Sequence, residues 1–108
     1  MSTYHFDATS FRNYVWVKGG ATFRNPEELS IELTTQGAFR VEVYDGGALA
    51  YSYRKKGQRA TWTSLYFNGN GVDDYGTPIV PLRGEYQFKL VNEAQGTRKA
   101  RQGELEYA

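Results

Sequence analysis

Three stretches of this chain alternate apolar and polar residues with a period of two. In the clearest of them, Tyr86, Phe88 and Leu90 alternate with charged or amide side chains. Successive side chains of a β-strand point to opposite faces, so this pattern predicts a strand with one buried face. The pattern recurs at residues 29–34 and 39–44. Together the three stretches assign eight residues to the core: Ile31, Leu33, Phe39, Val41, Val43, Tyr86, Phe88 and Leu90.

Turn-forming residues separate these stretches at short intervals, as in Asp45-Gly46-Gly47. The 16% aromatic content, with nine Tyr and two Trp, suits pleated sheets. We therefore predict an all-β fold, a single antiparallel β-sandwich of Ig-like or fibronectin-like topology with seven to nine short strands. A chain of 108 residues has room for one core, so residues 1–108 are expected to form one domain. A five-stranded oligonucleotide-binding barrel is the alternative.

The strands near the two ends of the chain are less clearly patterned. Residues 3–8 are expected to form a short edge strand. Residues 14–18 are expected to turn at Gly19-Gly20 and pair with 21–24 as a hairpin. The segment 97–108 is charged over most of its length. We predict an edge strand or a mobile tail there, because charges on an edge discourage pairing between molecules.

A longer pattern runs from Phe67 to Leu90: an aromatic residue, Asn-Gly, a pair of Asp, a Gly, an apolar-Pro return and then Gly-x-Tyr-x-Phe-x-Leu. It resembles the Ig-like β-sandwich domain of flagellar hook-capping proteins. Residues 39–47 likewise resemble that family's strand, which ends in Tyr-Asp before a glycine turn. Phe67-Asn68 stands where the family usually has Trp-Asp. The resemblance covers roughly residues 27–91, and it implies a role in the assembly or capping of surface appendages.

Residues suited to catalysis are scarce. His5 is the only histidine, and the chain contains no cysteine. The serines lack the local setting of a nucleophile, and neighbouring carboxylates such as Asp73 and Asp74 usually point apart on a loop. We therefore predict that the protein is not an enzyme.

The loop that carries the Asp pair also offers oxygen atoms to a metal ion. Asn68, Asn70, Asp73 and Asp74 are the weak calcium candidates, because Ca²⁺ prefers oxygen ligands. Their spacing is not that of an EF-hand, however, and Asn and Asp in glycine-rich loops usually form turns. We predict turn-forming roles, no strong metal site and no cofactor.

Four aromatic residues are assigned to outward-facing positions by the alternation around them: Trp16, Tyr44, Trp62 and Tyr66. Exposed rings on a sheet can stack on sugar rings or pack against a partner protein. A sandwich can also absorb several aromatic residues without any binding role. The four residues are therefore candidates for a binding surface, for either protein or carbohydrate.

The charge pattern restricts the class of partner. The formal net charge is +1, although Arg54, Lys55, Lys56 and Arg59 form one basic cluster. A charged hairpin tip is usually a solvated turn, so we do not expect nucleic acid as a partner. No apolar run is long enough to cross a membrane, and the first residues do not form a signal peptide. Membrane insertion is therefore not expected, and the protein is expected in the cytoplasm or within a particle or appendage.

Two functions remain open from the sequence. The first is a non-enzymatic structural or assembly module that acts by protein–protein contact or self-association, as a component of a surface appendage, virion or secretion apparatus. The alternative is a carbohydrate-binding module that uses the outward aromatic residues. A flat or grooved platform of exposed rings would favour the alternative, whereas rings covered by another subunit would favour assembly.

Overall fold

The structure is a computed structural model that describes residues 1–57 and 62–108. Predictions for Arg59 and for the start of a strand at residues 60–61 lie outside the described residues. The elements are β1 (Ser2–Phe6), β2 (Thr9–Phe11), β3 (Tyr14–Trp16), the 3-10 turn η1 (Val17–Gly20), β4 (Phe23–Arg24), β5 (Glu28–Leu33), β6 (Phe39–Asp45), β7 (Ala48–Lys55), β8 (Trp62–Tyr66), β9 (Gly71–Val72), β10 (Pro78–Ile79), β11 (Glu85–Asn92) and β12 (Arg98–Tyr107).

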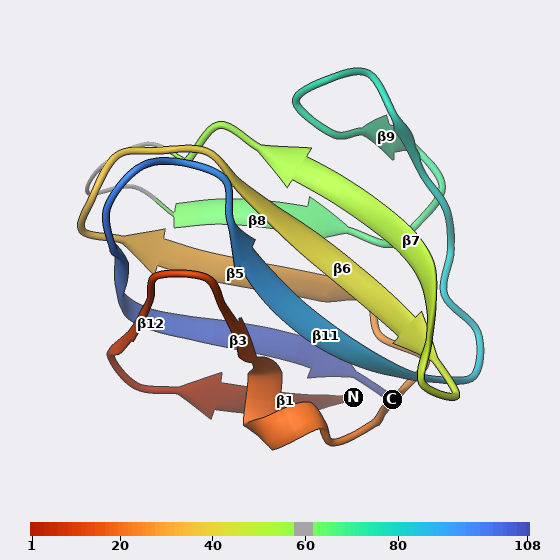
Figure 1. The fold of residues 1–108 in the computed structure, drawn as a ribbon. Coiled ribbons are helices and arrows are strands. Elements are labelled where there is room, and N and C mark those ends of the chain that lie inside the picture. The colour runs from red at the N-terminus through yellow and green to blue at the C-terminus, as the bar shows by residue number, and fades with distance from the viewer. Residues whose placement is uncertain (58–61) are drawn as a thin grey trace.

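Two antiparallel sheets pack face to face and form the sandwich (Figure 1). One sheet has the order β1-β12-β5-β8, and the other has the order β3-β11-β6-β7. The short strands β2 and β4 add to β12 and β11, and β9 pairs with β10. The predicted antiparallel β-sandwich is confirmed. Its two sets of four main strands have the order of a jelly roll, whereas an immunoglobulin-type sandwich divides seven strands into four and three.

The core lies between the two sheets. Seven of the eight residues assigned to it by alternation are buried: Ile31, Leu33, Phe39, Val41, Val43, Phe88 and Leu90. The eighth, Tyr86, is only half-buried, and its hydroxyl donates a hydrogen bond of 2.9 Å to the carbonyl of Arg83. Phe88 lies among aromatic rings, with centroid distances of 6.1 Å to Phe23 and 5.6 Å to Phe67.

The prediction of an edge strand or a mobile tail at 97–108 is wrong. β12 is the longest strand, and it lies inside its sheet between β1 and β5. Its inward face has a weak apolar pattern, because Gly103 lies under the ring of Phe6 and leaves Leu105 as the clearest apolar residue there. A β-bulge at Arg101 also shifts the alternation. Glu104 and Glu106 alternate with the buried Gly103 and Leu105 and lie on the outer face, whereas Arg98 at the start of the strand is buried.

The predicted hairpin between 14–18 and 21–24 is also wrong. β3 and β4 both pair with β11 and not with each other. Lys18, Gly19 and Gly20 all have positive φ, so the chain makes a wider turn there than a two-residue hairpin. The predicted edge strand near the N-terminus is confirmed as β1, which pairs with β12 and is the first strand of its sheet in the described structure.

No helix within residues 1–57 and 62–108 has the length and apolar character needed to span a membrane.

Candidate functional site

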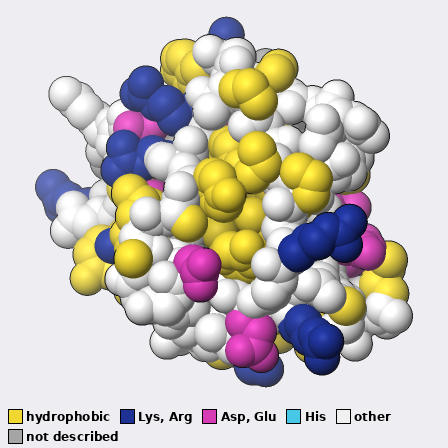
Figure 2. Space-filling view, turned by 90° about the vertical axis from the view of Figure 1, so that its right-hand side faces the viewer, with side chains coloured by type: hydrophobic (Ala, Val, Ile, Leu, Met, Phe, Trp, Pro, Cys, Tyr) yellow, Lys and Arg dark blue, Asp and Glu magenta, His cyan; other side chains and the backbone are white. Residues whose placement is uncertain are grey.

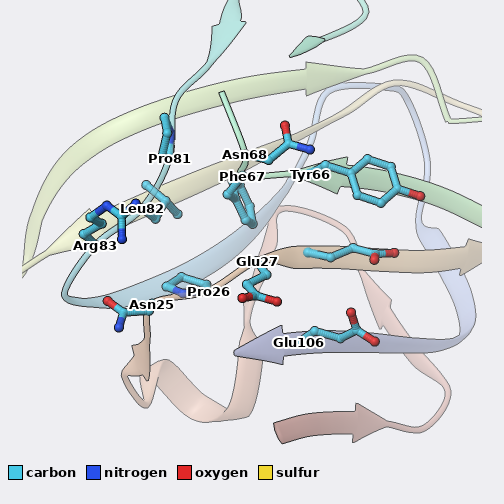
Figure 3. Close-up of a pocket in the computed structure, with 11 residues that line it drawn as sticks. Asn25, Pro26, Glu27, Tyr66, Phe67, Asn68, Pro81, Leu82, Arg83 and Glu106 are labelled. Carbon is cyan, nitrogen blue, oxygen red and sulfur yellow. The ribbon is translucent and has the colours of Figure 1, made fainter. Parts of the chain in front are cut away.

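A cleft of about 480 Å³ opens at the end of the sandwich where β5 begins and where β8 and β12 end (Figure 3). Figure 2 looks onto the right-hand side of Figure 1, where this end lies, and shows hydrophobic side chains surrounded by charged ones. Four segments that are far apart in the sequence meet at the cleft. Its lining residues are Asn25, Pro26, Glu27, Glu28, Tyr66, Phe67, Asn68, Pro81, Leu82, Arg83 and Glu106.

Apolar side chains give the cleft a fixed base. Phe67 and Leu82 belong to the core, with exposed fractions of 4% and 3%, and Pro26 is fully buried. Tyr66 is the last residue of β8 and follows the buried Leu65, so it points to the outer face of the sheet, where 52% of it is exposed. The cleft thus combines a rigid apolar base with one accessible aromatic ring.

The two asparagines of the cleft are held in place by the backbone. Asn25 Oδ1 accepts a hydrogen bond of 2.8 Å from the N–H of Gly84, and Asn68 Oδ1 accepts one of 3.0 Å from the N–H of Asn70. Because the side-chain carbonyl of each asparagine is bonded in this way, its NH₂ group remains able to donate a hydrogen bond to a ligand. In this way the two asparagines add fixed donors to the cleft.

The charged groups of the cleft are mostly uncommitted. Glu28 accepts a hydrogen bond of 2.6 Å from the hydroxyl of Ser30. The side chains of Glu27, Glu106 and Arg83 form no hydrogen bond or ion pair with another side chain of the described part of the chain. The cleft thus offers both acceptors and donors to a polar ligand.

The strand register arranges part of the cleft in a row. Glu28 on β5 lies opposite Tyr66 on β8 and opposite Glu106 on β12. Neighbouring strands are about 4.8 Å apart, so the three side chains form a row roughly 10 Å long on the outer face. Four residues before Tyr66 on the same face, roughly 13 Å along the strand, Trp62 is 43% exposed opposite Glu32.

The other two aromatic candidates lie on the opposite face of the molecule. Trp16 and Tyr44 belong to the β3-β11-β6-β7 sheet, and their ring centroids are 4.9 Å apart. The ammonium group of Lys89 lies 4.2, 5.1 and 5.6 Å from the ring centroids of Tyr14, Trp16 and Tyr44. Lys89 therefore occupies the space among these three rings, where cation–π attraction holds its ammonium group.

The carboxylate of Glu42 fixes the ring of Tyr44. The hydroxyl of Tyr44 donates a hydrogen bond of 2.7 Å to Glu42, whose carboxylate also lies 4.0 Å from the ammonium of Lys89. The hydrogen bond to Glu42, and then the partial burial of the ring, raise the pKa of Tyr44 above its usual value. Trp16 and Tyr44 are thus half-buried and engaged, and the four aromatic candidates do not form one surface.

The oxygen atoms proposed for calcium serve the backbone of the loop. Asp73 is 4% exposed and accepts hydrogen bonds of 2.8, 2.8 and 2.9 Å from the N–H groups of Arg54, Tyr75 and Thr77. Burial favours a higher pKa for Asp73, but the three donors outweigh it, so the pKa is lowered. Asp74 accepts from the N–H of Lys56 at 2.7 Å.

These bonds attach the loop to the edge of β7. Asn68 forms a turn with Asn70, so three of the four calcium candidates accept hydrogen bonds from the backbone. Among the residues that the structure describes, no group of three or more His, Asp or Glu side chains is close enough to hold a metal ion.

The comparisons with known proteins are sparse. No family model matches the sequence, and no curated protein matches it. Among solved structures, the fold is similar to the CBM36-1 domain of a multidomain xylanase from the hindgut metagenome of Trinervitermes trinervoides. The likeness covers 98% of this chain and 77% of that one, at 12% identity and a TM-score of 0.37. This TM-score is too low for the likeness to bear on function. The resemblance to hook-capping proteins stays a prediction.

Among the cleft residues discussed above, the sequence had indicated Tyr66 as a binding candidate and Asn68 as a weak calcium candidate. It missed Glu27, Glu28 and Glu106. The alternation at 29–34 already predicted an outer face for the even-numbered residues of β5. The bulge in β12 concealed the matching outer position of Glu106.

Proposed function

We propose that this chain is a non-enzymatic binding module and that the cleft around Tyr66 binds a carbohydrate. The observation that supports this proposal is the combination of an exposed aromatic ring with uncommitted carboxylate and amide groups in one cleft of about 480 Å³. Ligand sites usually combine apolar and aromatic walls with a few polar groups that fix orientation. The dimensions of the cleft suit part of an oligosaccharide, with the rest of the ligand in solvent.

The chemistry of a sugar matches these groups. The C–H face of a pyranose ring packs on an aromatic face, here that of Tyr66, while its hydroxyls donate to carboxylates and accept from amides. Glu28 and Glu106 lie in the same row as Tyr66, so a sugar stacked on the ring has acceptors beside it. Asn68 follows Tyr66 by two residues and supplies a donor.

A binding role without catalysis is supported by the exposure of the carboxylates. A glycoside hydrolase needs one carboxylic acid whose environment keeps it protonated, commonly through burial in an apolar pocket. Glu27 is exposed, and Glu28 and Glu106 are half-buried. None of the three lies in an apolar pocket of that kind.

Calorimetry with a panel of neutral oligosaccharides tests the proposal. We expect binding by at least one member, and a loss of affinity of about tenfold or more in Tyr66→Ala. Tyr14→Ala is the matched control, because Tyr14 is exposed to a similar extent, 54% against 52%, on the opposite face. Binding to no member of the panel, or equal losses in the two variants, would contradict the proposal.

Assembly by protein–protein contact is the second candidate, and the open edge of β8 favours it. In that role the protein acts as a component of a larger structure, such as a surface appendage, virion or secretion apparatus. Both candidates involve β8, because the cleft uses the side chain of Tyr66 and assembly uses first the backbone of the strand.

A further inference from the structure

We infer that the free edge of β8 is a homodimer interface, at which β8 of one copy pairs antiparallel with β8 of a second copy. The pairing joins the two β1-β12-β5-β8 sheets into one continuous sheet about a two-fold axis at Ser64. This inference does not depend on carbohydrate binding, because it rests on the backbone and on the charges beside it.

The backbone of β8 leaves alternate residues without partners. The N–H of Phe67 donates to the carbonyl of Glu27 at 2.9 Å, in the register that pairs β8 with β5. In an antiparallel ladder, hydrogen-bonded pairs alternate with non-bonded ones. The N–H and C=O groups of Trp62, Ser64 and Tyr66 therefore point away from β5, and β8 is the last strand of its sheet in the described structure (Figure 1).

The described residues leave space beside this edge. A hollow of about 370 Å³ lies between β8 and the end of β7, lined in part by Trp62, Thr63, Ser64 and Lys56. The β8 strand carries no charged residue from Trp62 to Tyr66, and charge is a common device that protects an edge. The corresponding edge of β7 is closed by Asp73 and Asp74.

The free groups of β8 are complementary to themselves. An antiparallel pairing centred on Ser64 sets Ser64 opposite its copy and Trp62 opposite Tyr66 in both directions. The three residues with free N–H and C=O groups thus pair only with one another, each pair exchanging two hydrogen bonds. Trp62 and Tyr66 lie on the same face, so the pairing also brings aromatic rings together across the strands, an arrangement that stabilises sheets.

The charged residues near the edge favour an antiparallel pairing with a second copy of this chain. Lys56 flanks the edge at its Trp62 end, where Lys55 is paired with Asp74 at 3.3 Å and Glu32 lies across from Trp62 on β5, whereas Glu27 and Glu28 lie at its Tyr66 end. An antiparallel pairing brings the basic end of each copy beside the acidic end of the other. A parallel pairing would bring like charges together. Because a single strand pair makes a small interface, we expect a weak dimer that forms with rising concentration.

Sedimentation equilibrium of the chain, from about 10 μM to about 1 mM, tests the inference. We expect the mass to rise from 12.3 kDa toward twice that value. Ser64→Pro removes an N–H that faces away from β5, so it should spare the monomer and lower the association constant about tenfold or more. Ser64→Ala is the control, because it also loses the 2.8 Å bond to the hydroxyl of Ser30 but keeps the N–H. A monomer at every concentration, or a dimer that Ser64→Pro leaves intact, would overturn the inference.

Amide hydrogen exchange of the unsubstituted protein gives a second test, which holds even where Ser64→Pro unfolds the chain. The N–H groups of Trp62, Ser64 and Tyr66 should exchange more slowly as the concentration rises. Those of Thr63 and Leu65 should not change, because β5 already protects them. A dimer in which the exchange of Ser64 is independent of concentration uses a different interface and contradicts the inference.

Discussion

On the outer face of the β3-β11-β6-β7 sheet, aromatic and charged side chains contact one another. On the outer face of the β1-β12-β5-β8 sheet, Trp62, Tyr66 and several glutamates are largely free. The first face holds Lys89 among its rings, and Arg40 bridges Glu42 and Glu93 at 3.1 and 3.3 Å. The edges differ in the same way, because the loop that carries Asp73 closes β7, whereas no described strand covers the outer edge of β8.

This difference shows that an outward position does not make an aromatic residue available to a ligand. Trp16 and Trp62 occupy equivalent positions in the alternation, yet only Trp62 has an open surface around it. The partners of Trp16 come from β6 and β11, strands that are distant in the sequence. The contacts of the first face therefore mainly stabilise the fold, and the second face is the one to which the proposed binding belongs.

The largest expected effect concerns the closed edge. Asp73→Ala should lower the free energy of unfolding by about 3 kcal/mol, because three N–H groups lose the charged acceptor that the buried Asp73 provides. Asp74→Ala, in the same loop but less buried, should cost about 1 kcal/mol or less. Urea unfolding measures both changes. Equal losses would show that the edge of β7 does not depend on Asp73.

The pH dependence of the same carboxyl sharpens this test. The pKa of Asp73 in the folded protein lies below its ordinary value of 3.8. The unfolded chain therefore binds the proton first as the pH falls. The stabilisation from Asp73 should be complete above about pH 5 and decline as the pH falls through the folded pKa. Asp73→Asn should reduce the slope of stability against pH in this acid range, and an unchanged slope would contradict the assignment.

The two tryptophans provide the direct test of the comparison. Trp16→Ala should lower the free energy of unfolding by about 2 kcal/mol, because the ring is half-buried against Tyr44 and Lys89. Trp62→Ala should cost less than about 0.5 kcal/mol in a dilute monomer, because its ring is exposed. Thermal unfolding at low concentration compares the two variants. Similar costs would remove the distinction between the faces.

Most of the sandwich could be predicted from the sequence, because alternation reports directly which face of a strand is buried. β5, β6 and β11 were predicted in this way, and seven of their core residues are buried. β12 could not be, since Gly103 replaces an apolar side chain and the bulge at Arg101 shifts the pattern. Which strands pair also depends on contacts between residues far apart in the sequence, and for this reason the hairpin at 14–24 was wrong.

Less of the candidate site could be predicted. Alternation assigned Tyr66 to the outer face, but the cleft depends on the loop at 81–83 and on the end of β12, which approach β8 only in the folded chain. Parity likewise predicted that Tyr44 points outward, but not that Lys89 and Glu42 would occupy the space around its ring. Exposure depends on such neighbours, and a local pattern does not contain them.

The smallest expected effect concerns the hydroxyl of Tyr44. Its pKa should lie above the ordinary value of 10.0, because it donates a hydrogen bond to Glu42 and is partly buried. Glu42→Gln should bring that pKa back toward the ordinary value, since the neutral amide neither repels the phenolate nor requires the phenol proton as strongly. A tyrosine titration followed by NMR, with the resonance of Tyr44 assigned, measures this shift. A titration of Tyr44 that Glu42→Gln leaves unchanged would show that Glu42 does not hold this hydroxyl, and the contrast between the engaged ring of Tyr44 and the exposed ring of Tyr66 would then be weakened.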